Sequence, residues 1–402
     1  MEPADLDSCY LARPVTSGPR YHFFGYFGIQ PWDVTGRYLL CLEVSFDNRP
    51  PLADDKATVG LVELSSLKFI RLTETRAWNF QQGAMMHWLP SASNSVIFND
   101  REGDRFVSVI LNVHTGERRV LPRPITAISH DGKTALSLNF SRLQWARPGY
   151  GYAGIEDVYA DQNNPSDDGI YLVDLDSGED RRVVSLTDAL SLYGDAKSLK
   201  NCPLFFNHAL CNTDDTRFAF LIQWKSTIIP RRAQLWKLRK LAKLNAIMLT
   251  VNLDGSDLRY LSDFENVSHF DWRNSHEILM WAKRRGGPES YYIASDDNSD
   301  FKEIGQRVLR EDGHCSFSPN RRFILTDTYP DQNRYMELKI YFIEEERQVI
   351  LGRYYSPRQF SEEIRCDLHP RWNRTGDQIC FDSVHEDNRQ LYVMDVSKLT
   401  NE

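Results

Sequence analysis

The sequence lacks most features of a disulfide scaffold, a membrane protein or a helical bundle. Cysteine occurs only 7 times in 402 residues, and Cys41, Cys211, Cys315, Cys366 and Cys380 lie inside apolar, strand-like runs. This suits buried, reduced thiols better than a disulfide framework. No run approaches the roughly 18 consecutive apolar residues of a membrane helix. The N-terminal MEPADLDSCYLARP has neither the basic nor the apolar region of a secretory signal. We therefore expect a cytoplasmic protein, or a secreted one if a leader was trimmed from the sequence.

The sequence also lacks an excess of positive charge. Its formal net charge is −8, while 41% of its residues are hydrophobic and 26% are charged. This composition is typical of a folded protein. The negative net charge argues against a protein that binds nucleic acid or anionic membrane with its whole surface. One local exception is the basic stretch KSTIIPRRAQLWKLRKLAKLN, which begins at Lys225. After Pro230 its leucine spacing predicts a short amphipathic helix. Its cationic face would either bind an acidic polymer or oligomer, or form an oligomer contact or a solvated surface.

Helical periodicity is scarce, and one strand-rich unit recurs seven times along the chain. Each unit contains an inner strand, a turn resembling Ser-Pro-Asp-Gly, a second apolar strand and a later hairpin. The first turns begin at Gln30, Leu89, Ser129, Asn212, Arg273, Ser318 and Asn373. One small sheet cannot bury both faces, whereas radially stacked sheets cover one another. The sequence therefore predicts an all-β, seven-bladed β-propeller as a single domain over residues 1–402. The expected blades cover approximately residues 22–70, 80–121, 123–186, 202–261, 266–306, 312–354 and 365–399.

Four of the ten histidines share one place in the repeat, four residues before the first turn. They are His208, His269, His314 and His369. This position lies near the start of the innermost strand, so we expect the side chains to converge on the axial channel. Converging neutral imidazoles suit a divalent transition metal, with Asp271, Cys315 or Asp367 as possible additional ligands. Alternatively, each histidine hydrogen-bonds to the neighbouring blade.

The first three blades have different residues at this axial position, namely Tyr26, Met85 and Ile125. The other polar candidates on that side include Gln82, His87, Arg101, Arg142, Arg147, Tyr150 and Tyr152. Guanidinium groups pair with carboxylate or sulfate through two parallel hydrogen bonds, which predicts an anionic ligand. The alternative for any single arginine is a solvated surface charge.

Longer motifs carry a resemblance to a known family. They include YHFFGYFGIQPWDVTGRYLL, FQQGAMMHWLP with IFNDR, ALSLNFSRLQWARPGYGY, FNHALCNTDDTRFAFLIQW and DGHCSFSPNRRFILTDTYPD. Together these motifs resemble the β-propeller polysaccharide lyases, first the ulvan-lyase-like group and more distantly the oligogalacturonate lyases. The resemblance runs from about residue 20 to residue 400 and implies a lyase that cleaves a uronic-acid-containing glycan by β-elimination.

The resemblance also implies roles for individual residues. Tyr150, in RPGYGY, is the expected base and acid, with His208 as its partner. The expected substrate contacts are Gln82, Arg101, Arg147 and Tyr152. The expected ligands of a divalent metal, zinc or manganese, are His269, His314, Cys315 and His369.

The second blade departs from the ulvan-lyase pattern, in which it contributes a histidine. Its axial residue here is Met85. Either His87 takes that catalytic role, or the substrate differs, or the activity is absent. The competing function is a propeller that binds a glycan or protein without turnover. A serine-peptidase propeller is disfavoured because the sequence has no Gly-x-Ser-x-Gly nucleophile motif.

Overall fold

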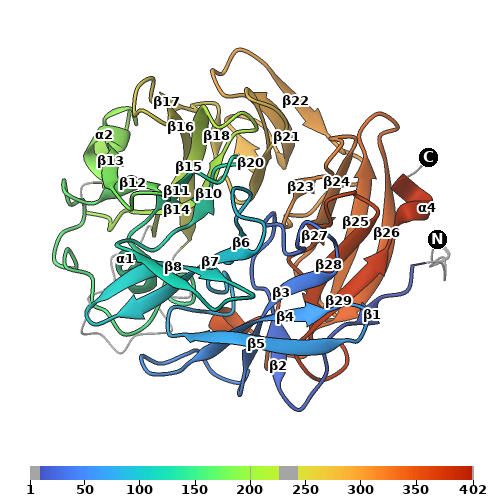
Figure 1. Ribbon diagram of the computed structural model, residues 1–402. Coiled ribbons are helices and arrows are strands. Elements are labelled where there is room, and N and C mark those ends of the chain that lie inside the picture. Colours follow the sequence, from blue (N-terminus) through green and yellow to red (C-terminus); the bar gives the residue numbers. More distant parts are fainter. Residues whose placement is uncertain (1–9, 200, 226–242, 401–402) are drawn as a thin grey trace.

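The computed structural model describes residues 10–199, 201–225 and 243–400. Its strands form seven separate sheets arranged in a ring around a central axis (Figure 1). This confirms the predicted seven-bladed β-propeller. The predicted basic helix after Pro230 lies outside the described residues.

The first four sheets follow one another in chain order. The first contains β2 (Tyr21–Phe23), β3 (Tyr38–Val44), β4 (Ala57–Glu63) and β5 (Lys68–Thr75), and the second contains β6 (His87–Trp88), β7 (Ser95–Glu102), β8 (Arg105–Asn112) and β9 (Arg118–Leu121). The third contains β10 (Ala127–Ile128), β11 (Thr134–Ser137), β12 (Gly169–Asp174) and β13 (Asp180–Ser185), and the fourth contains β14 (Phe205–Cys211), β15 (Arg217–Lys225), β16 (Leu244–Asn252) and β17 (Arg259–Tyr260). All of their strand pairs are antiparallel.

The last three sheets complete the ring. The fifth contains β18 (Phe264–Glu265), β19 (Phe270–Trp272), β20 (Glu277–Arg284), β21 (Glu289–Ser295) and β22 (Phe301–Ile304), and the sixth contains β23 (Ser316–Phe317), β24 (Phe323–Asp327), β25 (Tyr335–Phe342) and β26 (Arg347–Tyr355). The seventh contains β27 (Arg371–Trp372), β28 (Gln378–Ser383) and β29 (Gln390–Asp395), with β1 (Arg13–Pro14) as its outer strand. The last sheet therefore joins the two ends of the chain.

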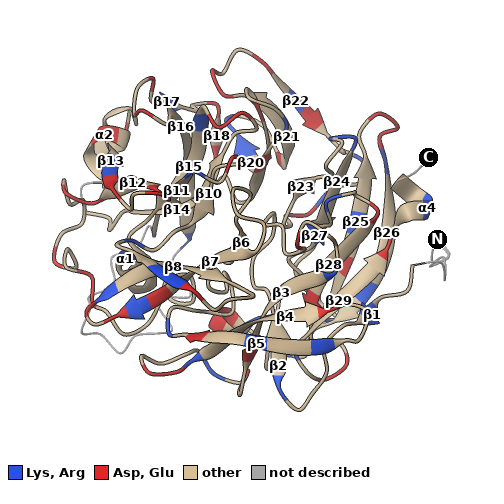
Figure 2. Cartoon of the chain, viewed as in Figure 1, with Lys and Arg blue, Asp and Glu red and all other residues tan. Residues whose placement is uncertain are grey.

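The core consists of the apolar faces that neighbouring sheets press together. The second strand of a blade is mostly buried, and β24 is buried along its whole length, because sheets cover both of its faces. Outer strands such as β5 alternate exposed and partly buried residues. Figure 2 accordingly shows β3 and β6 mostly in tan, with blue and red on outer strands such as β5 and β22.

The helices of the described residues are short; all but the last lie in connections between strands, and the last follows β29. They are α1 (Phe140–Ala146), α2 (Leu186–Ser191) and α4 (Ser397–Thr400), with 3₁₀ turns at η1 (Ala196–Leu199) and η2 (Glu362–Ile364). None of the helices in the described ranges is long and apolar enough to cross a membrane. Asn139 caps α1 by accepting a hydrogen bond from the backbone N–H of Arg142. This helix begins the excursion that carries Arg147 and Tyr150 between β11 and β12.

Candidate active site and metal centre

The four axial histidines meet at the centre of the ring. The ring centroids of His269 and His314 lie 4.3 Å apart, those of His314 and His369 lie 4.2 Å apart, and His208 is 6.2 Å from His269. All four side chains are buried. Each histidine belongs to a different blade, so the propeller repeat itself brings the four together.

The backbone adjusts locally to direct one of these histidines. The pairing of β14 with β15 shifts register between Asn207 and Leu210, and His208 has a φ of 49° inside this irregularity. A β-bulge changes the direction of a side chain relative to the regular ladder. Met85 and His369 hold the equivalent axial positions in their blades and also have positive φ, at 48° and 44°. The unusual conformation is therefore not specific to histidine, and it is not shared by every axial position, since His269 and His314 lack it.

His314, Asp367 and His369 could hold one metal ion. Each offers one ligand atom, and the three atoms lie within 4.8 Å of one another. The Asp367 Oδ2 atom is 4.0 Å from His314 Nε2 and 3.9 Å from His369 Nε2. Two atoms bound to the same ion at about 2.0–2.2 Å cannot be more than about 4.4 Å apart, so both separations are compatible with a shared ion.

The surroundings of the triad also fit a metal. His314 Nδ1 lies 2.9 Å and 3.0 Å from the two carboxylate oxygens of Asp327. Metal-binding histidines commonly donate their second ring N–H to a carboxylate in this way, which fixes the tautomer and the ring orientation. Two imidazoles and a carboxylate are donors that suit zinc, manganese or iron better than calcium.

The protonation preferences of the histidines differ with their neighbours. Burial lowers the pKa of His369 well below its ordinary value, and the neighbouring His314 lowers it further. Burial also lowers the pKa of His269, which the Asp312 carboxylate offsets only in part. For His314, burial acts in the same direction, but the carboxylates of Asp327 and Asp367 raise its pKa overall. His369 is therefore neutral, as metal binding requires, whereas the carboxylates beside His314 favour its protonated form, so that a metal ion would have to displace its proton.

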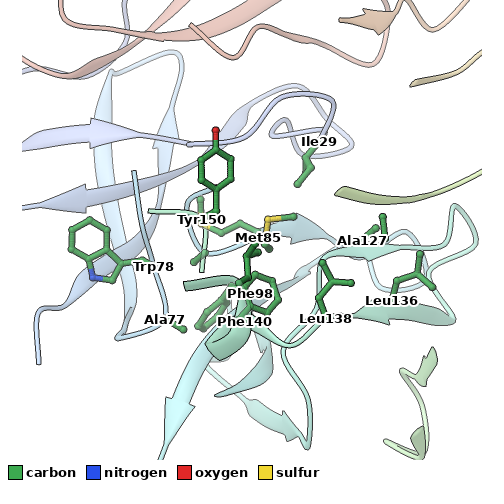
Figure 3. Close-up of a cluster of buried hydrophobic side chains, with 14 of the residues drawn as sticks. Ile29, Ala77, Trp78, Met85, Phe98, Ala127, Leu136, Leu138, Phe140 and Tyr150 are labelled. Carbon is green, nitrogen blue, oxygen red and sulfur yellow. The ribbon is translucent and has the colours of Figure 1, made fainter. Parts of the chain in front are cut away.

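Tyr150 lies beside this triad and is held by two arginines. Arg365 Nη2 donates a 2.6 Å hydrogen bond to the Tyr150 hydroxyl, and Arg365 Nε donates a 2.6 Å bond to Asp367. The Arg147 guanidinium lies 3.5 Å from the centre of the Tyr150 ring. Figure 3 shows the Tyr150 ring above Met85, with its hydroxyl pointing away from the apolar cluster. Arg365 therefore connects the predicted base directly to a predicted metal ligand.

Tyr26 connects the first blade to the histidines. Its hydroxyl and His208 Nδ1 share a 2.6 Å hydrogen bond. Burial, with the repulsion of nearby Arg147, lowers the pKa of His208 well below its ordinary value. His208 is therefore neutral near pH 7. When its Nδ1–H donates to Tyr26, Nε2 is left to accept a hydrogen bond or a proton.

A cavity of about 450 Å³ opens beside these residues. We call it the front cavity. Its walls include Arg147, His208, Gln223, Ser268, His269, Glu289, Glu311 and Asp312. The volume lies in the range of small-ligand sites. Arg147 supplies positive charge at one side, while Glu289 and Glu311 make another part of the wall acidic.

Several residues expected at the site lie elsewhere. Tyr152 is fully buried, stacks on Phe140 and hydrogen-bonds with Asn99, so it is a core residue that cannot contact a substrate in this arrangement. Arg101 pairs with Asp54 at 3.2 Å, and Gln82 donates to Asn207 inside the structure. Neither lines the front cavity, and Tyr150 and the three triad residues do not line it either; of the expected site residues, Arg147, His208 and His269 do.

Cys315, Asp271 and His87 also lie outside the triad. Cys315 is fully buried in an apolar cluster, and burial raises its thiol pKa well above the ordinary value, which disfavours the thiolate that binds metals. Asp271 accepts a hydrogen bond from the Phe317 backbone N–H. His87 lines a different cavity. All three residues line this other cavity, so the structure does not bring them to the triad, and their expected roles stay predictions.

Four contributors escaped the sequence analysis: Arg365, Asp312, Asp327 and Tyr329. Asp327 is the last residue of β24, and Asp312 and Arg365 lie in connections between blades. Tyr329 follows β24, and its ring lies 6.3 Å from that of His269 and 5.6 Å from that of His314. A signal for one of them was present, because Arg365 stands two residues before Asp367 and four before His369.

The comparisons with known proteins concern the fold. No family model and no curated protein matches the sequence. An oligogalacturonate lyase from Vibrio parahaemolyticus has a similar structure, with a TM-score of 0.67 at 14% identity, covering 97% of this chain and 94% of that one. An oligogalacturonate lyase in complex with manganese gives a TM-score of 0.66 at 15% identity, covering 96% and 92%. The β-propeller domain of the Trilobed protease from Pyrococcus furiosus gives 0.51 at 11%, covering 93% and 96%. At these identities the comparisons show a shared β-propeller fold and leave the ulvan-lyase group without support.

Proposed function

We propose that this protein is a metal-dependent lyase that cleaves a uronate-containing oligosaccharide by β-elimination. The proposal depends on one observation: Arg365 donates hydrogen bonds both to the Tyr150 hydroxyl and to the Asp367 carboxylate. A group that can transfer protons is thereby linked to three residues that could bind a metal ion. The similarity in fold to oligogalacturonate lyases, one of them a manganese complex, agrees with it.

The reaction makes three demands on a protein. The C5 proton of a uronate is weakly acidic, so positive charge must first neutralise the adjacent carboxylate. A base then removes the C5 proton, the C–H electrons form the C4–C5 double bond, and the C4–O bond breaks. The departing oxygen takes up a proton from an acid. The axial residues supply candidates for each step.

Tyr150 is our candidate for both proton transfers. The hydrogen bond from Arg365 and the Arg147 guanidinium over the ring fix the position of the phenol oxygen. In the proposed reaction this oxygen accepts the C5 proton and then returns it to the departing oxygen. Neutral His208 assists through its unprotonated ring nitrogen.

His314, Asp367 and His369 would hold the divalent metal, zinc or manganese. When bound there, the ion would add positive charge that stabilises the uronate carboxylate as charge develops. The acidic wall formed by Glu289 and Glu311 would direct that carboxylate toward the Arg147 side of the front cavity. These charges therefore favour one orientation of the substrate.

The decisive experiment follows the ultraviolet absorbance of the unsaturated product. The protein is incubated with a panel of galacturonate, glucuronate and iduronate oligosaccharides, before and after chelation and after Mn²⁺ or Zn²⁺ is restored. We expect one class to react, with chelation removing the activity. Calorimetric binding without any absorbance change would instead establish the competing function of a glycan-binding propeller.

The variant Tyr150→Phe tests the assigned proton-transfer residue. We expect kcat to fall by about 10²-fold or more, because a positioned acid or base contributes a factor of that size. The matched control is Tyr335→Phe, which removes a hydroxyl from an exposed tyrosine on β25. An unchanged kcat in Tyr150→Phe would reject the assignment while leaving the lyase activity itself in place.

A further inference from the structure

The front cavity borders on the candidate active site without enclosing it. Tyr150 and the three triad residues stand outside its walls. Among the wall residues, the Arg147 guanidinium lies 3.5 Å from the centre of the Tyr150 ring, and the His269 ring lies 4.3 Å from that of His314. The His208 ring lies 6.3 Å from the Tyr150 ring. A sugar in this cavity would therefore be the neighbour of the uronate that reacts at Tyr150.

Most of the charged groups in the cavity wall are acidic. Glu289, Glu311 and Asp312 contribute three carboxylates. Glu289 and Glu311 are exposed and have no ion-pair partner among the described residues. Asp312 accepts a 3.0 Å hydrogen bond from His269 Nδ1. Burial acts to raise the pKa of the Asp312 carboxyl, but the neighbouring His269 lowers this pKa overall, so Asp312 is ionised.

Arg147 provides the only guanidinium among the described wall residues. It faces Tyr150 and donates a 3.2 Å hydrogen bond to Gln223. One guanidinium can neutralise one carboxylate, and in the proposed reaction that carboxylate belongs to the reacting uronate. A carboxylate or sulfate on the next sugar would instead face Glu289 and Glu311. Like charges brought together in this way disfavour binding.

The remaining wall suits a sugar without an acidic group. Trp281, Val267, Leu244 and Ala246 supply apolar surface that the C–H groups of a sugar ring can contact. Ionised carboxylates only accept hydrogen bonds, and sugar hydroxyls donate them. An uncharged sugar can therefore use the same acidic groups that repel a uronate.

We infer that the substrate is a glycan in which the reacting uronate is linked to a sugar without carboxylate or sulfate, and that Glu289 and Glu311 select this sugar in the front cavity. The inference rests on the proposed function and narrows its substrate class. A chain made only of uronates, such as oligogalacturonate, is then a poor substrate, although the fold is similar to that of oligogalacturonate lyases.

Two matched pairs of tetrasaccharides test this selection. In the first pair, glucuronate either alternates with N-acetylglucosamine or is linked only to glucuronate. In the second, galacturonate either alternates with rhamnose or is linked only to galacturonate. We expect kcat/KM to be at least about tenfold higher for the alternating member, because the all-uronate member brings like charges together. An equal or higher kcat/KM for the all-uronate member would overturn the inference and leave the lyase function in place.

A double variant, Glu289→Gln with Glu311→Gln, removes two charges and nearly keeps the shape of the wall. We expect the preference for the alternating member to fall about tenfold, mainly through a lower KM for the all-uronate chain. The difference from the wild type should shrink at high ionic strength, because salt screens exposed charges. Glu117→Gln, at an exposed carboxylate outside the cavity wall, is the matched control and should keep the wild-type preference. An unchanged preference in the double variant would contradict the selection.

Calorimetry separates this inference from the proposed function. If no tetrasaccharide is cleaved, the same compounds are titrated into the wild type and the double variant. Tighter binding of the alternating members, with the preference lost in the double variant, would support the selection in a protein without lyase activity. Equal binding within each pair, tighter binding of the all-uronate members, or no binding at all would overturn it.

Discussion

Asp367 joins the two parts of the candidate active site. Its carboxylate is one of the three groups that could bind the metal ion, and it also accepts a hydrogen bond from Arg365. Arg365 in turn holds the Tyr150 hydroxyl. A change at this single carboxylate would therefore affect both the metal and the base.

The variant Asp367→Asn tests the triad. The amide keeps the shape and can still accept from Arg365, but it removes the negative charge that a divalent cation requires. We expect the affinity for Mn²⁺ or Zn²⁺ to fall more than about 100-fold, since even partners outside the metal ligands contribute 10–100-fold. Calorimetric titration measures it, with exposed Asp104→Asn as the control. Equal affinities would show that the ion, if it binds, sits elsewhere.

For single residues, the sequence predicted which of them lie near the axis better than it predicted where their side chains point. The shared spacing of His208, His269, His314 and His369 before their turns placed all four rings on the axis, because the repeat fixes that position. Tyr150 and Tyr152 stand two residues apart in one motif, yet one hydroxyl meets Arg365 and the other meets Asn99. The two side chains point in different directions because they lie in the irregular segment between β11 and β12. No strand periodicity in the sequence predicts such directions.

Among the elements, the excursion after β11 depends on Arg142. Sequence analysis grouped this arginine with the axial polar residues, but it is fully buried as an anchor. It pairs with Asp157 at 3.0 Å and donates to the backbone carbonyls of Leu204, Gln162 and Asn163. The excursion that carries Arg147 and Tyr150 is thereby tied to the strand that carries His208.

The variant Arg142→Met should destabilise the protein by about 3–5 kcal/mol, because it leaves buried carboxylate and carbonyl groups without their partner. Differential scanning calorimetry would detect the lower unfolding temperature. Arg181→Met provides the control, since Arg181 also donates to backbone carbonyls but is exposed, and a loss below about 1 kcal/mol is expected there. Similar small effects for both variants would contradict the anchoring role.

The whole molecule depends on how its ring is closed. Strand β1 pairs with β29 and so completes the last blade with residues from the other end of the chain. The Val15 N–H donates to Leu391, Thr16 accepts from the Leu391 N–H, and the Val15 side chain is buried.

Removal of residues 1–16 should lower stability by about 3–5 kcal/mol. This sum combines a few backbone hydrogen bonds at about 1 kcal/mol each with the burial of Val15 at about 1.5–3 kcal/mol. Thermal unfolding measures it, and aggregation should increase because β29 becomes an open edge. Arg13→Ala is the control, since this exposed side chain contributes nothing to the backbone ladder. An unchanged unfolding temperature would show that the ring closes without β1.

The same pairing bears on how the protein is made. During synthesis the β1 segment leaves the ribosome before any of the seven blades, whereas its partner β29 is translated after the first six. The first six blades can form on the nascent chain one after another, since their strands are close in sequence. The seventh cannot be completed until all of the others have emerged. Until β29 has emerged, β1 has no partner strand. If translation stalls before β29, β1 stays exposed to chaperones and to neighbouring nascent chains.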